Sequence, residues 1–359
     1  MNYLIPWWKS KPSPLAALAA GKAIITRKLS EGSITKRLEK KLCLKEGSKH
    51  CIMTPSGSTA LLLGMKALGV EAGDEVIVPN LTWIATANAA HTLGAKIKIA
   101  NTSSENGVID VDSIKDLITS KTKLIVPVVL NGNIPDFKRI AEISASYSNS
   151  NIKILVDCCQ AIGCKIFSRF NKYFDAIAYS FAVTKIITSG QGGAICINDP
   201  EIDKNARLIK NNGCNDIRIP LYITSGINLK YSDVLASMLE IHLDNLEKNI
   251  NKVKKLRQVY RRNLNINGIA RLIETPANGY SIYNFLEVQT IRRDEMINIF
   301  KNHGIETRIF PGGLSTANHL KQEGLKDSNE FADRMIYLPS GPDQDLNKIS
   351  KILSQINFD

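Results

Sequence analysis

Short apolar runs alternate with longer amphipathic stretches between about residues 48 and 200. The apolar runs are rich in β-branched residues, which is typical of strands, and the stretches between them are typical of helices. This alternation predicts a mostly parallel sheet with helices on both faces. The expected strands include Glu75–Val78, Lys96–Ala100, Lys123–Val129, Ile152–Val156, Ala176–Tyr179 and Ala194–Ile197, and the expected helices Thr59–Leu68, Ala85–Leu93 and Phe137–Tyr147.

A different pattern begins near residue 231. Apolar residues recur every three or four positions from Tyr231 to Leu264, which predicts one long helix. We expect a large domain over residues 1–245, and over 246–359 the long linking helix with a small α+β domain. The first thirty or so residues are expected to pack with the small domain or against the large one. The later pattern comprises a strand-like Ser281–Val288, a helix over Arg293–Asn302 and a closing helix near Leu346–Ile356.

Composition sets only broad limits. The 359 residues are 44% hydrophobic and 22% charged, which excludes a disordered tail, a collagen and a polytopic membrane protein. The net charge of +12 allows anionic partners, but the densest basic run, Lys252–Arg262, lies on the predicted long helix, where a solvated face is favoured. We therefore expect no nucleic acid partner and no membrane association.

The seven cysteines form no Cys-x-x-Cys pair, and no paired-histidine spacing accompanies them. We therefore expect no metal site, and reduced thiols in a cytoplasmic protein. Near the start, Lys22 interrupts the apolar stretch Leu15–Ala20, which argues against a secretion signal.

Two charged residues follow expected strands, at the edge where open parallel sheets bind their ligands. Asp157 directly follows Ile154–Val156, and a partly buried carboxylate there needs a cation or hydrogen bonds to stay ionised. Lys185 lies in a loop ahead of the glycine cluster 190–193, and a desolvated lysine is a nucleophile for carbonyl carbons. Taken singly, a helix cap and an exposed loop lysine explain these two residues as well.

The segment Pro55–Ala60 opens a helical pattern with small and hydroxyl-bearing residues. Accessible first-turn amides and the helix dipole favour a phosphate there, although an ordinary helix cap is the alternative. The segment lacks the spacing of a nucleotide-binding P-loop and of a dinucleotide fold. It therefore gives no support to nucleotide hydrolysis or hydride transfer.

Trp83 also follows an expected strand, and its indole can stack on a flat heteroaromatic ring, although core packing would explain it equally. The four features complement one another. An amine nucleophile, an anion site, a stacking surface and a carboxylate are what pyridoxal 5'-phosphate requires. The sequence therefore predicts that this cofactor binds at the end of the sheet.

These residues are similar to those of the DegT/DnrJ/EryC1/StrS family of pyridoxal-phosphate sugar aminotransferases, which have the aspartate aminotransferase fold, fold type I. The likeness runs in order from about residue 30 to 340. It implies an aminotransferase that depends on pyridoxal phosphate (PLP), with a mostly parallel, seven-stranded sheet in its large domain and a smaller α+β domain. The residues that bear it are Gly73–Pro79, Leu81–Asn88, Asp157–Ala161, Ser180 and Phe181 with Lys185, and Gly190–Gly193.

The resemblance assigns roles to individual residues. Lys185 would bind the cofactor covalently and move the substrate proton, and Asp157 would pair with the pyridine nitrogen. Asn228, in a segment like the family's Gly-Tyr-Asn, would reach the phosphate of the neighbouring subunit in a homodimer. Lys230 and Arg308 would lie near substrate. The other cofactor contacts would come from Gly57, Ser58, Thr59, Trp83, Gln160 and Ser180.

The chain departs from the family pattern at a few positions. Val129 and Asn131 stand where the family usually has His and often Tyr, Ile162 replaces a frequent His, and Lys230 replaces a frequent Arg. We expect these positions near the rim of the pocket, where they affect the substrate more than the cofactor. Because Lys185 is retained, the dehydratase branch, which has His there, is excluded.

The resemblance also implies a reaction. L-Glutamate would donate its amino group to a nucleotide-linked keto-deoxysugar, with C4 the family's commoner keto position and C3 the next, for cell-surface polysaccharide or glycoside biosynthesis. The alternatives are a keto-sugar without a nucleotide, a cyclitol, or a catalytically silent regulatory protein. The last would be expected to have lost Lys185 or Asp157.

Overall fold

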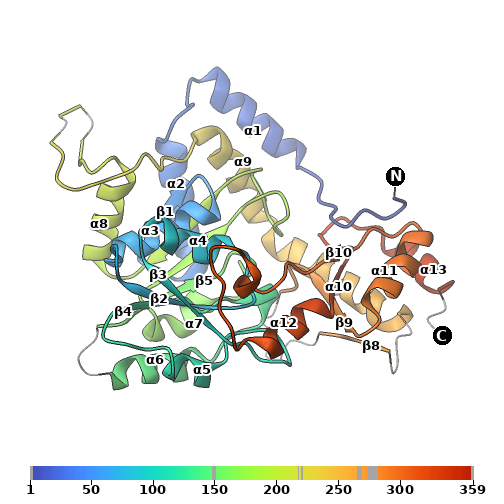
Figure 1. The fold of residues 1–359 in the computed structure, drawn as a ribbon. Helices are drawn as coiled ribbons and strands as arrows, with labels where there is room; N and C mark the ends of the chain where they lie inside the picture. The colour runs from blue at the N-terminus through green and yellow to red at the C-terminus, as the bar shows by residue number, and fades with distance from the viewer. Residues whose placement is uncertain are drawn as a thin grey trace.

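The computed structural model describes residues 3–147, 151–216, 218–219, 221–264, 269–273 and 282–356 (Figure 1). The chain builds one large and one smaller sheet. The large sheet has seven strands in the order β1-β7-β6-β5-β4-β2-β3. Its strands are β1 (His50–Thr54), β2 (Glu75–Pro79), β3 (Lys96–Ala100), β4 (Thr122–Ile125), β5 (Lys153–Asp157), β6 (Ala176–Ser180) and β7 (Gly193–Ile197).

The large sheet is mostly parallel, as the alternating pattern predicts. Strands β3, β2, β4, β5 and β6 run parallel, and β7 is antiparallel to both β6 and β1. The apolar side chains of β2 alternate between two clusters, with Val76 and Val78 in one and Ile77 in the other. Both faces of the sheet are thus buried, which places its ligand-binding edge at the carboxyl ends of the parallel strands.

Helices cover both faces of this sheet (Figure 1). The helices of this part of the chain are α1 (Pro14–Ile25), α2 (Ser33–Glu46), α3 (Gly57–Ala67), α4 (Ala85–Thr92), α5 (Val111–Lys115), α6 (Phe137–Ser146), α7 (Ile166–Phe170), α8 (Pro200–Lys210), α9 (Asp233–Asp244) and α10 (Leu246–Asn263), with short 3₁₀ turns η1 (Leu130–Gly132) and η2 (Asn171–Tyr173).

The smaller sheet is antiparallel, in the order β10-β11-β9-β8. Ile5 and Trp8 near the N-terminus form bridges with Ile305 and Ser340 of this part, whereas α1 packs on α9. The elements here are β8 (Ala270–Leu272), β9 (Leu286–Thr290), α11 (Arg293–Asn302), β10 (Arg308–Ile309), η3 (Leu314–Thr316), α12 (Lys326–Asp333), β11 (Met335–Leu338) and α13 (Leu346–Leu353).

The structure corrects three of the expected elements. The single long helix is two, because Asn245 leaves helical geometry at φ −92° and ψ 2° and its N–H turns back to His242 O at 3.0 Å. Strand β4 ends at Ile125, two residues before Pro127, which has no N–H to donate to a ladder. Strand β1 was not predicted. Part of the expected strand Ser281–Val288 lies outside the described residues, and β9 starts at Leu286.

Candidate active site

Asp157 lies at the carboxyl end of β5 and is 5% exposed. Thr86 Oγ1, from α4, donates to Asp157 Oδ2 at 2.7 Å, and the Cys159 amide donates to Oδ1 at 3.0 Å. Each carboxylate oxygen therefore has a donor, which meets the condition for keeping a buried carboxylate ionised.

Lys185 belongs to the loop between β6 and β7, which we call the lysine loop (residues 181–192). Its amine is half-buried and lies 5.8 Å from the centre of the Phe285 ring. Burial lowers the pKa of the Lys185 amine, against the opposing effects of Cys159 and Asp157. A lowered pKa favours the neutral, nucleophilic form of the Lys185 amine.

The lysine loop is tied to several other elements. Asn249 Nδ2 of α10 donates to Ile186 O at 2.9 Å, and Asn284 Nδ2 donates to Thr184 O at 3.3 Å. The hydroxyls of Ser189 and Tyr231 lie 2.6 Å apart. These contacts hold Lys185 between the large sheet and the smaller one.

The N-terminus of α3 faces the same place. Ser56 caps the helix by accepting from the Thr59 amide at 3.2 Å. A Cβ atom on Gly57 would lie 2.7 Å from Ser180 Cβ and 3.0 Å from Cys159 Sγ. Only glycine permits this approach, which brings the positive end of the helix dipole against Ser180, at the end of β6, and Cys159, which follows β5.

The hydroxyl residues of this turn differ in their availability. Ser58 is exposed, whereas the Thr59 hydroxyl takes part in the cap by accepting from the Ser56 amide at 2.9 Å. Ser180 is buried, next to Gly57. The turn thus offers a helix N-terminus with adjacent hydroxyls, an arrangement suited to a phosphate.

Gln160 and Trp83 are two of the residues expected to contact the cofactor. The Asn131 amide donates to Gln160 Oε1 at 2.9 Å, so Gln160 is fixed by the turn after β4. Trp83 precedes α4 and is 62% exposed, so its indole is available to a ligand. Val129, Asn131 and Ile162 are all buried, which corrects the expectation that they lie at the pocket rim.

Asn228 and Lys230 lie apart from these groups, on a segment we call the arm (residues 211–230), which projects beside α8 (Figure 1). Asn228 is exposed and forms a bridge with Asn211, and the Leu229 amide donates to Lys210 O at 3.0 Å. The arm is therefore anchored on the end of α8. In this position Asn228 is free to contact another molecule.

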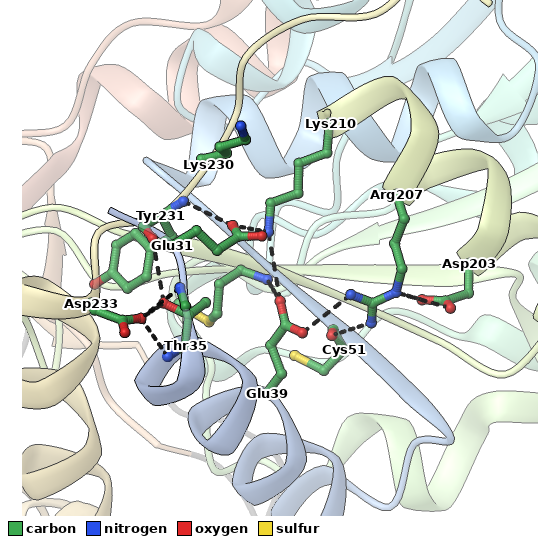
Figure 2. Close-up of polar contacts among 12 residues, drawn as sticks. Glu31, Thr35, Glu39, Cys51, Asp203, Arg207, Lys210, Lys230, Tyr231 and Asp233 are labelled. Atoms are coloured by element: carbon green, nitrogen blue, oxygen red, sulfur yellow. Dashed lines mark hydrogen bonds and ion pairs between the residues drawn. The ribbon is translucent and has the colours of Figure 1, made fainter. Parts of the chain in front are cut away.

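A buried ionic cluster fixes the end of α8 (Figure 2). Lys210 is 3% exposed, and its Nζ lies 2.5 Å from Glu31 Oε2 and 3.6 Å from Glu39 Oε1. Glu39 also accepts from Arg207 Nη1 at 3.2 Å, whereas the Lys230 side chain points away from the cluster. The cluster thus joins α8 to α2 and supports the arm.

Arg308 stands at the edge of the smaller sheet. Its Nη2 donates to Glu306 Oε1 at 2.7 Å, and its guanidinium lies 5.6 Å from the centre of the Trp7 ring. The side chain is exposed. The structure therefore does not bring Arg308 into contact with Lys185 or Asp157.

Sequence reasoning named Asn131 only as a departure from the family pattern, and it missed three other groups that lie around the predicted site residues. Thr86 supports Asp157, Asn131 supports Gln160, Phe285 faces Lys185, and Glu287 accepts from Asn131 Nδ2. Thr86 lies within Leu81–Asn88, one of the stretches that bear the family resemblance. Glu287 lies on β9 and Phe285 directly precedes that strand, but no local signal places either residue against the large sheet.

The residues present fit pyridoxal 5'-phosphate, which is the cofactor. A buried, hydrogen-bonded carboxylate, a lysine with a lowered pKa and a helix N-terminus admitted by Gly57 meet at one end of the sheet. Among the described residues, no group of three His, Cys, Asp or Glu side chains is arranged to hold a metal ion. Within the same ranges, none of the helices combines the length and apolar character needed to span a membrane.

Comparison with known proteins shows which family this chain is similar to. The profile of the DegT/DnrJ/EryC1/StrS aminotransferase family matches residues 17–357. A GDP-perosamine synthase of Escherichia coli O157:H7 is 28% identical over 334 residues, 91% of this chain and 90% of that protein. A UDP-2-acetamido-2-deoxy-3-oxo-D-glucuronate aminotransferase of Pseudomonas aeruginosa is 30% identical over 325 residues, 89% of each chain.

A solved structure has the same fold. The putative sugar aminotransferase Spr1654 from Streptococcus pneumoniae, in its PMP form, superposes with a TM-score of 0.89 and 20% identity, over 99% of this chain and 96% of that one.

Proposed function

Because this chain belongs to the DegT/DnrJ/EryC1/StrS aminotransferase family, we propose that its amino acceptor is a keto-sugar linked to a nucleoside diphosphate. Its activity is that of a pyridoxal phosphate-dependent aminotransferase. The relatives named for GDP-perosamine and for a UDP-linked 3-oxo sugar support a nucleotide-linked acceptor. We propose L-glutamate as the donor, and C4 or C3 as the carbon that receives the amine.

The aminotransferase chemistry rests on Asp157, held at the end of β5 by Thr86 and the Cys159 amide, and on Lys185, whose pKa burial lowers. Bound pyridoxal phosphate supplies an electron sink for the carbanion formed at the substrate. The Lys185 amine accepts the proton from the donor's α-carbon and later returns one to the acceptor carbon, which requires it to be neutral near the working pH. Asp157 holds the proton on the pyridine nitrogen, while the α3 N-terminus and Ser180 hold the phosphate.

The proposed acceptor can be tested by its ability to take the amino group from the aminated holoenzyme. Holoenzyme is first aminated with L-glutamate, freed of donor, and then mixed with matched pairs of 4-keto and 3-keto sugars, each with and without its nucleotide. We expect one nucleotide-linked sugar to restore the visible band of the lysine-bound cofactor. A response to the free sugar equal to that of its nucleotide form would overturn the nucleotide part of the proposal.

We further propose that the protein is a homodimer in which the partner subunit's Asn228 completes each cofactor site. The arm that bears Asn228 also bears exposed apolar side chains, which a second subunit would cover. These are Ile219, Leu221, Tyr222, Ile223 and Ile227.

Mixing two inactive variants tests the shared site. We expect a mass of twice 39.6 kDa in solution. Lys185→Ala and Asn228→Ala homodimers should each be impaired, and their mixed dimer should regain one site with both residues intact. Activity that does not rise on mixing would place Asn228 at its own chain's site, or outside the site altogether.

Seven free thiols, five of them buried, suit a reducing cytoplasm, and we propose that location. We place the product in the biosynthesis of a cell-surface polysaccharide or glycoside, as the perosamine synthase relative suggests.

A further inference from the structure

A buried glutamate of the smaller sheet contacts the turn that holds Gln160. Glu287, on β9, is 7% exposed, and Asn131, in η1, is 1% exposed. Asn131 Nδ2 donates to Glu287 Oε1, while the Asn131 amide donates to Gln160 Oε1 at 2.9 Å. One asparagine therefore links the smaller sheet to a predicted cofactor residue.

The contact is tight. Gly132, next to Asn131, has φ +94°, and a Cβ atom there would lie 2.0 Å from Ile282 O. The cavity beside the pair measures about 10 Å³, room for a single water molecule at most. The pair is thus a docking contact between two parts of the chain and not the wall of a substrate pocket.

The hydrogen bonds of this pair are incomplete if the carboxyl is ionised. Asn131 Oδ1 is buried, and no side chain or amide of the described residues donates a hydrogen bond to it. A protonated Glu287 carries an O–H that can donate to it, which would give a neutral acid–amide pair with two hydrogen bonds. A carboxylate would instead place a negative charge beside the unpaired amide oxygen, in a buried site.

We propose that Glu287, in its protonated form, is a positioning residue that acts through Asn131 to hold Gln160 at the cofactor site. Ionisation of Glu287 would loosen this contact and, through Gln160, weaken the hold on the cofactor. The inference concerns the cofactor site of the proposed aminotransferase, but it does not depend on which sugar is the acceptor.

The titration of Glu287 falls in an accessible range. Burial raises the pKa of Glu287 to about 8, against the lowering effect of the hydrogen bond from Asn131. Burial raises the pKa of Tyr337, its neighbour on β11, well above the ordinary value, against the lowering effect of the Asn131 side chain, so Tyr337 stays neutral there. Arg257, from α10, and Tyr283 line the same cavity. We therefore assign the charge change expected between pH 7 and 9 to Glu287.

The test compares cofactor affinity in holoenzyme variants at pH 7 and pH 9. Glu287→Gln keeps a neutral group with a donor, so at pH 7 its cofactor affinity should stay within about twofold of that of the unmodified enzyme. Between pH 7 and pH 9 the cofactor affinity of the unmodified enzyme should fall several-fold more than that of Glu287→Gln, with a midpoint near pH 8. Glu295→Gln, which removes an exposed carboxyl from α11, is the matched control and should behave as the unmodified enzyme.

Two further variants identify the route. Glu287→Ala should weaken cofactor binding about tenfold or more at both pH values, and combining it with Gln160→Ala should add little, because both act on one contact. The inference would be overturned if Glu287→Gln showed the same pH dependence of cofactor affinity as the unmodified enzyme. It would also be overturned if the effects of Glu287→Ala and Gln160→Ala on cofactor affinity were fully additive. If no nucleotide sugar served as acceptor, the proposed substrate would be refuted. The inference about Glu287 would still stand or fall on the cofactor affinities, which need no acceptor.

Discussion

The hydroxyl of Thr86 donates a 2.7 Å hydrogen bond to Asp157 Oδ2. Thr86 lies in the first turn of α4, and its hydroxyl is 2.9 Å from that of Thr82. The segment that presents Trp83 to a ligand therefore also orients the carboxylate at the end of β5. Two of the predicted cofactor contacts are thus fixed by one short stretch of chain.

Replacing Thr86 by valine should weaken cofactor binding without unfolding the protein. The change keeps the shape of the side chain but leaves Asp157 Oδ2 without its donor, at a cost of ~1–3 kcal/mol. Such a cost corresponds to roughly a fivefold to hundredfold weaker affinity. Titration of the apoenzyme with pyridoxal phosphate, followed by visible absorbance, measures it.

The control is Thr92→Val on the same helix. Thr92 Oγ1 is exposed and donates to Asn88 O at 2.8 Å, away from Asp157. The cofactor affinity of Thr92→Val should match that of the unmodified enzyme. Equal affinity in Thr86→Val would mean that this hydrogen bond does not orient the carboxylate for the cofactor.

Replacing Lys185 by alanine should abolish transamination while the apoprotein still folds. In the proposed function this side chain moves the substrate proton, and because it is half-buried in a loop, its loss costs the core little. We expect a fall of ~10²–10⁴-fold or more in rate, and no visible band of lysine-bound cofactor. Steady-state assays, absorbance and circular dichroism measure the three effects.

Reductive trapping with borohydride provides a second readout for Lys185. Because its pKa is lowered, more of its amine is neutral at a given pH than that of an exposed lysine. The trapped pyridoxyl group should therefore appear on the peptide with Lys185, and trapping should persist to lower pH than at exposed Lys204. A label spread evenly over surface lysines would contradict the assignment.

The sequence predicts the parts of the site that are local and misses the contacts that depend on packing. Asp157 and Lys185 follow apolar runs, and Gly57 opens a helical pattern, so each is visible in a short window. Asn131 and Glu287 lie 156 positions apart and meet only when the smaller sheet docks on the turn after β4. Likewise, the break at Asn245 interrupts an apolar spacing that continues through it, so periodicity alone predicts one helix.

Replacing Lys210 by methionine should destabilise the fold and loosen the arm. The change removes the cation between Glu31 and Glu39, and breaking a buried pair costs ~3 kcal/mol or more. Because the Leu229 amide bonds Lys210 O, the arm that bears Asn228 should also lose support. Urea unfolding measures the first effect, and proteolysis of the arm the second.

The matched control is Lys204→Met, six positions earlier on α8. Lys204 is exposed, and its amine is 3.9 Å from Glu201 Oε2, so its loss should change stability little. Unchanged stability in Lys210→Met would show that the cluster of Figure 2 contributes nothing net to folding.

Replacing Tyr179 by phenylalanine should destabilise the protein in a pH-dependent way. The Tyr179 hydroxyl donates to Glu46 Oε2 at 2.6 Å, and both side chains are buried. Burial raises the pKa of Glu46, whereas this hydrogen bond lowers it, so removing the hydroxyl raises the folded-state pKa further. A raised folded-state pKa gives stability that is complete below the unfolded-state pKa and is lost as pH rises through the folded-state pKa.

The Tyr179→Phe variant should therefore lose ~1–3 kcal/mol of unfolding free energy at pH 8 and less at pH 5. Urea unfolding at the two pH values measures the difference, with Tyr147→Phe, whose hydroxyl is on the surface, as the control. An equal loss at both pH values would mean that Glu46 keeps one protonation state throughout.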